Sequence, residues 1–94
     1  EDISYLIQFQ YPGGMVVSLT NNDLFLTSEN NVDDIIAWYK EKITQMGFNS
    51  KSVALTKTNG KVLCKMSASK QDQKINIEIN KTPEDNKVSI MVSY

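Results

Sequence analysis

Apolar residues recur at a spacing of three and four in the middle of the chain, and this pattern predicts one amphipathic helix. Asn31 precedes the pattern and is a favoured N-cap, because its side-chain oxygen accepts hydrogen bonds from the free amides of the first turn. Gly47 follows it and suits the left-handed position that ends many helices. We therefore predict a helix that begins at Asn31 and is stopped by Gly47. The residues on its apolar side are Val32, Ile35, Ile36, Tyr39, Ile43 and Met46.

Apolar and polar residues alternate through the C-terminal half, which predicts four antiparallel strands joined by three short connections. Asn59-Gly60 and Gln71-Asp72 are expected to form two-residue turns, and residues 82–85 a four-residue loop. Each connection fixes which residues lie opposite one another. The expected pairs are Val53 with Met66, Leu55 with Cys64, Met66 with Ile77, Cys64 with Ile79, Ala68 with Ile75, Ile75 with Val92, Ile77 with Ile90 and Ile79 with Val88. All are apolar, so one face of the sheet is expected to lie under the helix.

The N-terminal third predicts three further strands. Residues 3–11 alternate in the manner of a strand, and residues 15–20 and 24–27 form two short ones. Tyr11-Pro12-Gly13-Gly14 between them has the residues of a type II turn. The expected fold is a single α+β domain over residues 1–94, with one helix packed on one face of an antiparallel sheet. The expected order is β-β-β-α-β-β-β-β.

Composition excludes several kinds of function. The net charge of −1, with all ten basic residues lysine, argues against nucleic-acid binding, which needs a basic patch and favours arginine. The chain has no histidine, the commonest general base and metal ligand. Its apolar runs fall far short of the ~20 residues that cross a bilayer. We expect no catalytic residue, no metal site and no cofactor.

Few residues are candidates for chemistry, and most have a structural explanation. Cys64 lacks a histidine partner and falls on the apolar face, so we interpret it as a buried structural thiol. Asp33-Asp34 suits the positive end of the helix dipole, and Glu84-Asp85 a solvated loop. Tyr11-Pro12-Gly13-Gly14 lacks the lysine and the spacing of a phosphate-binding loop.

Trp38 is the one candidate for contact with a partner. Helical spacing places it about 110° from the centre of the apolar stripe, at the boundary of that stripe. A tryptophan in that position either folds over the rim of the sheet or anchors another protein, because tryptophan is enriched among interface hot spots. We favour the packing interpretation and keep the anchor as an alternative.

Three segments together resemble small exported bacterial lipoprotein domains of unassigned function. They are Tyr11-Pro12-Gly13-Gly14, the helix entry from Thr27-Ser28 through Asn31, and Met46-Gly47-Phe48. The family shows Tyr-Pro-Gly-Ala, a Thr-Ser-Asp-Ser-Pro-Glu-Glu-Val type entry, an aromatic-Tyr pair and Gly-Trp. This chain departs from it at four positions, with Gly14 for Ala, Val32 for Pro, Trp38 for Phe and Phe48 for Trp. The resemblance predicts that alanine is tolerated at position 14.

The resemblance implies a non-catalytic domain of an exported, lipid-anchored bacterial surface protein. Its partner is expected to be an unknown protein or small ligand, and its membrane contact only a lipid anchor outside these 94 residues. One alternative is a small enzyme that uses only Asp, Glu, Lys or Tyr. Such an enzyme needs a pocket that gathers several of these side chains, whereas a binding domain needs an apolar patch or an open strand edge. A cytosolic oligomerisation module is the second alternative.

Overall fold

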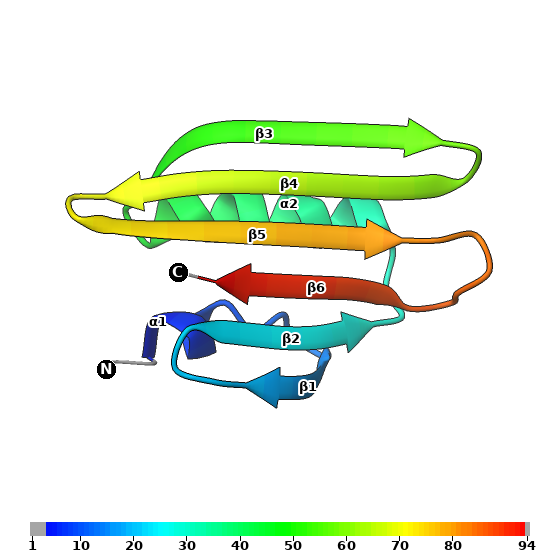
Figure 1. Ribbon diagram of the computed structural model, residues 1–94, viewed down its shortest axis with the longest axis horizontal. Coiled ribbons are helices and arrows are strands. Elements are labelled where there is room, and N and C mark those ends of the chain that lie inside the picture. The colour runs from blue at the N-terminus through cyan, green and yellow to red at the C-terminus, as the bar shows by residue number, and fades with distance from the viewer. Residues whose placement is uncertain (1–3, 94) are drawn as a thin grey trace.

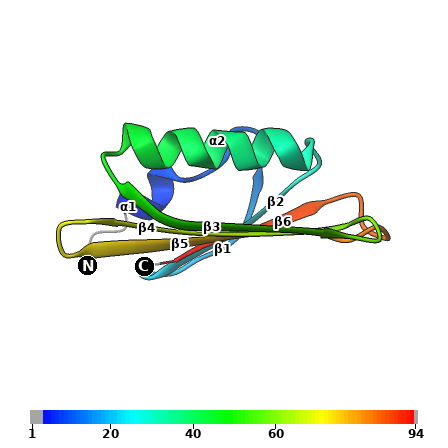
Figure 2. The same ribbon diagram turned by 90° about the horizontal axis from the view of Figure 1, so that it is seen from above.

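The computed structural model describes residues 4–93, which form a six-stranded antiparallel sheet with both helices on one face (Figure 1, Figure 2). The elements are α1 (Ser4–Gln8), β1 (Met15–Leu19), β2 (Asp23–Ser28), α2 (Val32–Gln45), β3 (Asn49–Thr58), β4 (Lys61–Lys70), β5 (Gln73–Lys81) and β6 (Val88–Ser93). The sheet order is β1-β2-β6-β5-β4-β3. The α+β class with an antiparallel sheet is thus confirmed, whereas the expected order of elements is wrong. The observed order is α-β-β-α-β-β-β-β.

The error lies in the first element, because the predicted strand over residues 3–11 is the helix α1 followed by a turn. Leu6 and Phe9 are both fully buried, while Ile7 between them is exposed. A strand would point Leu6 and Phe9 to opposite faces, whereas a helical turn places positions three apart on the same side. The segment was read as an alternating strand pattern, but Leu6 and Phe9 are an apolar pair at helical spacing. Ile3, the first residue of the predicted strand, lies outside the described residues.

The predicted helix is confirmed as α2, together with both of its caps. The Asn31 side-chain oxygen accepts hydrogen bonds from the amides of Asp33 and Asp34. At the other end Gly47 has φ +84°, and the Phe48 amide donates to the Ile43 carbonyl while the Gly47 amide donates to the Thr44 carbonyl. These two bonds define a Schellman motif, which satisfies the last carbonyls of the helix.

Two of the three predicted hairpin registers are confirmed. Asn59 and Gly60 both have positive φ, and β3 pairs with β4 so that Leu55 lies opposite Cys64. The turn at Gln71-Asp72 likewise pairs β4 with β5 so that Cys64 lies opposite Ile79. Turn chemistry alone therefore determined the register of the β3-β4-β5 part of the sheet.

The third register is shifted by two residues. Ile79 lies opposite Ile90 rather than Val88, because the connection spans residues 82–87 instead of 82–85. The Lys81 ammonium shapes this longer loop by donating to the carbonyls of Thr82 and Asp85. A shift of two residues leaves every side chain on its original face, so the apolar face is preserved.

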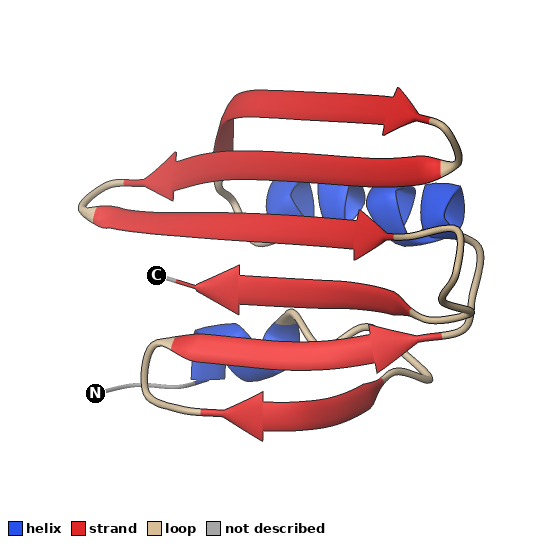
Figure 3. Ribbon diagram, turned by 45° about the vertical axis from the view of Figure 1, so that its right-hand side comes forward, coloured by secondary structure: helices blue, strands red, loops and turns tan. Residues whose placement is uncertain are grey.

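The core lies between the sheet and the two helices, but it stops short of both outer strands. Figure 3 shows α1 and α2 over different parts of the sheet, with α2 in contact with β3, β4 and β5 and α1 with β2. Val53 and Leu55 on β3 were expected to be covered, yet they are 43% and 48% exposed. A helix about 10 Å wide covers only two or three strands spaced about 4.8 Å apart.

Candidate functional site

Most of the exposed large apolar side chains in the described residues lie on β1, the edge strand beside β2, or next to it. Every residue of β1 is exposed, with Met15 at 65% and Val17 at 66%, and Phe25 of β2 is 44% exposed. We call this cluster the β1 patch. It consists of Met15, Val16, Val17, Leu19 and Phe25. Apolar clusters of this kind on a protein surface mark sites of interaction.

The outer side of β1 also offers unpaired backbone groups. The Thr20 amide donates to the Asp23 carbonyl across the turn, so the next pair, Leu19 with Leu24, is a non-hydrogen-bonded pair. The backbone N–H and C=O of Leu19 therefore point away from β2. A β-bulge between Val16 and Ser18 bends the strand and leaves Val17 as the extra residue. Because β1 is short and bulged, side chains must supply much of the stability of any pairing at this edge.

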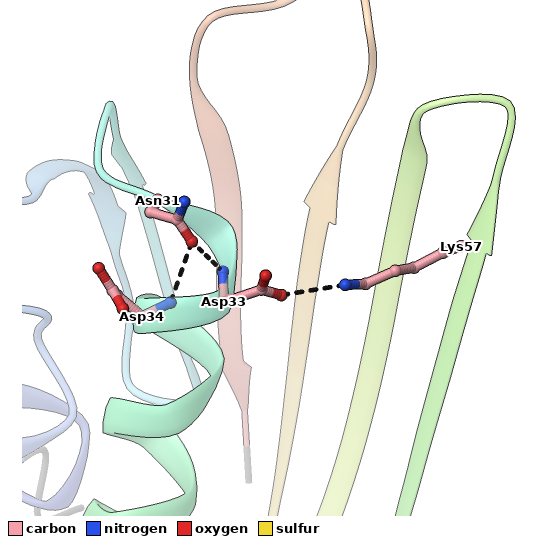
Figure 4. A network of polar contacts seen from close by, with 4 residues as sticks. All are labelled: Asn31, Asp33, Asp34 and Lys57. Carbon is pink, nitrogen blue, oxygen red and sulfur yellow. Dashed lines mark hydrogen bonds and ion pairs between the residues drawn. The ribbon is translucent and has the colours of Figure 1, made fainter.

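The two edges of the sheet differ in charge. Residues 12–22, which contain β1, hold no ionisable side chain. The other edge strand, β3, carries Lys51 and Lys57, and charged lysines on an edge strand oppose pairing with another chain. The Lys57 ammonium lies 3.2 Å from the Asp33 carboxylate at the start of α2 (Figure 4). Of the two edge strands, β1 is therefore the one that carries no charged side chain to oppose pairing with another chain.

The sheet face opposite the helices carries a shallow depression of about 350 Å³. Among its lining residues, Lys65 and Glu78 lie opposite each other, and Met91 lies opposite Glu78 on the next strand. The other lining residues are Ser52, Ala54, Met66, Ser67, Asn76, Ile77 and Ser93. The depression thus brings together one amine and one carboxylate, whereas the enzyme alternative needs several such groups in one pocket.

Trp38 is half-buried and packs against the core. Its ring makes edge-to-face contacts with Tyr39 at 4.8 Å and Tyr11 at 5.4 Å between centroids. The Lys42 ammonium lies 5.7 Å from the centre of its indole ring. These contacts agree with the position at the boundary of the apolar stripe. Contact between Trp38 and a partner stays a prediction.

Cys64 is fully buried on β4, as the register predicted. Burial raises the pKa of the Cys64 thiol, and the nearby Lys40 charge offsets only part of this effect. A raised pKa disfavours the thiolate, which is the nucleophilic form. Burial likewise raises the pKa of Tyr39 far above its usual range. Both groups are therefore neutral components of the core at neutral pH.

The paired carboxylates lie in the positions that the sequence predicted. Asp33 and Asp34 occupy the first turn of α2, where Asn31 caps their amides (Figure 4). The Asp85 carboxylate accepts from the Lys87 amide within the loop of residues 82–87. Within residues 4–93, no group of three or more Cys, Asp or Glu side chains is arranged to hold a metal ion.

The turn at residues 11–14 has the predicted form, with the Gly14 amide donating to the Tyr11 carbonyl and φ +82° at Gly13. The expected tolerance of alanine at position 14 is not supported. A Cβ there would lie 2.8 Å from Leu26 Cδ1 and 3.1 Å from the Tyr11 carbonyl oxygen. Leu26 is buried, so it has little room to move.

Sequence reasoning identified the strand at β1 but not its exposure. The sequence does contain an indication of this exposure, because residues 15–17 are three consecutive apolar residues rather than an alternating pattern. An uncharged run of this kind in a short strand is typical either of a strand buried on both faces or of an unprotected edge. Only the order of strands in the sheet distinguishes the two.

Comparison of the chain with protein-family models, with curated proteins and with solved structures gives no match. No helix within the described part of the chain is long and apolar enough to cross a membrane. Any function proposed for this chain therefore depends on its residues and on their arrangement.

Proposed function

We propose that this chain is a non-catalytic domain of an exported, lipid-anchored bacterial surface protein, and that it binds another protein segment at the edge of its sheet. The binding site is the β1 patch. The bound segment adds a seventh strand outside β1, so that it satisfies the free backbone groups and covers the apolar side chains at the same time. This is the mode of recognition known as strand addition.

The observation that carries this proposal is the combination of apolar exposure and an uncharged open edge at β1. Met15, Val17 and Leu19 all face solvent in a strand whose outer side has no neighbour among the described residues. Burying apolar surface is worth roughly 25 cal/mol per Å², so covering these side chains gives a partner strand a driving force. The exported and lipid-anchored setting is supported by the resemblance in the Tyr11-Pro12-Gly13-Gly14 and Met46-Gly47-Phe48 segments.

The setting is tested on the mature protein isolated from its native cell. Mass spectrometry of its N-terminal peptide is expected to find a lipid-modified cysteine exposed by removal of a signal peptide. An unmodified N-terminus in a soluble cell fraction would contradict the exported, anchored part of the proposal. It would favour the cytosolic oligomerisation module instead.

The binding edge is tested by site-specific photo-crosslinking in the producing cell. A photo-reactive residue replaces Val17 in one variant and Val53 in a matched control, because both are exposed valines on edge strands. We expect one discrete adduct at position 17, identified by mass spectrometry, and none at position 53. Equal adducts at both positions, or none at either, would contradict binding at β1.

A further inference from the structure

The four methionines of the chain all lie within the described residues, and they differ widely in exposure. Met15 on β1 is 65% exposed, whereas Met66 on β4 is 2% exposed. Met46 and Met91 are half-buried. The oxidation of a thioether depends on how easily the oxidant reaches its sulfur. Exposure therefore ranks Met15 as the first methionine that a dissolved peroxide oxidises.

The remaining sulfur of the chain does not compete for the oxidant. Cys64 is fully buried, and burial raises the pKa of its thiol. Peroxides react with the thiolate, which a raised pKa disfavours. Met15, by contrast, lines an open depression of about 220 Å³ together with Gly13 and Thr27. This volume is several times the ~30 Å³ that one water molecule takes up in the liquid, so hydrogen peroxide can enter it.

Met15 also belongs to the β1 patch, at the start of the edge strand. It lies opposite Thr27 of β2, on the sheet face away from the helices. A strand added outside β1 would place one of its own side chains beside Met15 on that face. An apolar neighbour makes a favourable contact with a thioether. The same neighbour beside a sulfoxide would partly desolvate a polar oxygen, which costs free energy.

We propose that Met15 is a redox-sensitive switch of the β1 edge, and that its oxidation to methionine sulfoxide by hydrogen peroxide releases the bound segment. This inference depends on the proposed function, because it names a regulation of the same site. The thioether sulfur attacks one peroxide oxygen, so that an S–O bond forms and the O–O bond breaks. The hydroxide that leaves takes the proton from the transferred oxygen and departs as water. Sulfur loses two electrons and the peroxide gains them.

The sulfoxide acts on binding and leaves the fold intact. The Met15 side chain lies outside the hydrophobic core, and the pairing of β1 with β2 uses backbone groups. Oxidation takes place while the edge is open, and mass action then depletes the bound form. A polar group in the apolar contact is expected to weaken binding by about tenfold or more. The change is reversible, because methionine sulfoxide reductases restore the thioether.

Peptide mapping of the purified chain tests the site of oxidation. The chain is treated with hydrogen peroxide at neutral pH, and mass spectrometry follows the sulfoxide content of each methionine over time. We expect Met15 to be oxidised about tenfold or more faster than Met66, with Met46 and Met91 between them. The far-ultraviolet circular dichroism is expected to stay unchanged when Met15 is fully oxidised. Oxidation of Met46 or Met91 before Met15 would overturn the assignment.

The photo-crosslink at position 17 tests the switch, because its yield reports how much of the β1 edge is occupied. The cell-envelope fraction is irradiated before and after peroxide treatment. We expect the adduct to fall by about tenfold and to return after incubation with methionine sulfoxide reductases and a thiol reductant. Met15→Leu keeps an apolar side chain that peroxide cannot oxidise, so its adduct should persist. Met91→Leu is the matched control, which retains Met15 and should lose the adduct as the wild type does.

The outcomes separate this inference from the proposed function. If the untreated fraction gives no adduct at position 17, the proposed function is contradicted and the switch falls with it. An adduct that forms before treatment and persists after full oxidation of Met15 would overturn the switch alone and leave binding at β1 in place. If Met15→Leu loses the adduct as much as the wild type does, oxidation acts at another residue, and the inference is wrong.

Discussion

The hydroxyl of Tyr39 on α2 donates a 2.7 Å hydrogen bond to the main-chain carbonyl of Phe9, and the two rings stack with 6.5 Å between their centroids. Phe9 follows directly after α1, so this contact joins the first helix to the second. Both residues are fully buried. The bond therefore holds in place the segment that leads through the turn at residues 11–14 to β1.

Tyr39→Phe removes this bond and leaves the Phe9 carbonyl without its partner. We expect the free energy of unfolding to fall by about 1–3 kcal/mol, the usual cost of an unsatisfied buried polar group. Urea denaturation measures the loss. Tyr11→Phe is the control, because the Tyr11 hydroxyl accepts from the Asn30 side chain in a half-buried position and should cost less. A larger loss for Tyr11→Phe would contradict this ranking.

Gly47→Val is expected to lower the free energy of unfolding by more than about 1 kcal/mol, because a β-branched residue is forced to positive φ. Gly47 has φ +84° and its added Cβ would meet only the flexible Lys70 side chain, at 3.4 Å. The loss thus reports backbone strain rather than a clash. Gly47→Asn is the matched variant and should lose much less, since asparagine tolerates this conformation. Equal losses in thermal denaturation would show that φ is not the cause.

The raised pKa of the Cys64 thiol makes the stability of the fold depend on pH. Its pKa is raised in the folded chain, so the unfolded chain releases the thiol proton at lower pH. This contribution to stability is complete below the unfolded pKa of about 8.5 and is lost as pH rises toward the folded pKa. We expect the wild type to lose more stability than Cys64→Ala between about pH 7 and 10. Parallel curves for the two proteins would contradict this assignment.

Cys64 should also react slowly with a polar thiol reagent in the native state, because it is fully buried. Labelling is expected to become fast only in denaturant. Rapid labelling of the native chain would contradict both the burial and the raised pKa of the thiol.

Trp38 should give partial quenching of its fluorescence by acrylamide, as expected for a half-buried indole. Trp38→Ala is expected to cost about 1–3 kcal/mol, below the ~3–5 kcal/mol of a fully buried aromatic. The lost stability comes from the ring contacts with Tyr11 and Tyr39. Trp38→Phe is the control that restores one ring. Full quenching with no loss of stability would favour the partner-anchor interpretation instead.

Local signals in the sequence predicted much of this fold. Asn31 and Gly47 each specify the backbone at a helix end by their own chemistry, and Asn59-Gly60 specifies a turn in the same way. The failures concern information that is not local. The length of the loop after Lys81 depends on contacts of that lysine with the loop carbonyls. The exposure of Val53 and Leu55 depends on how far α2 reaches across the sheet.

The candidate site was less predictable than the fold, for the same reason. The sequence places a strand at residues 15–20 and an aromatic residue at Phe25, but it does not say that β2 pairs with β6 and leaves β1 at the edge. The position of Trp38 at the boundary of the apolar stripe was predicted from helical spacing, which needs no knowledge of sheet order. A site formed by strand order is therefore seen only in the structure.

Amide hydrogen exchange is the most direct test of the claim that β1 is the binding edge. The purified chain is compared with the same protein in its native cell-envelope fraction. We expect exchange to slow at Val16, Val17 and Leu19 in the native fraction, while the β3 amides that face away from β4 keep their rates. Unchanged exchange at β1, or equal slowing at β3, would contradict the claim.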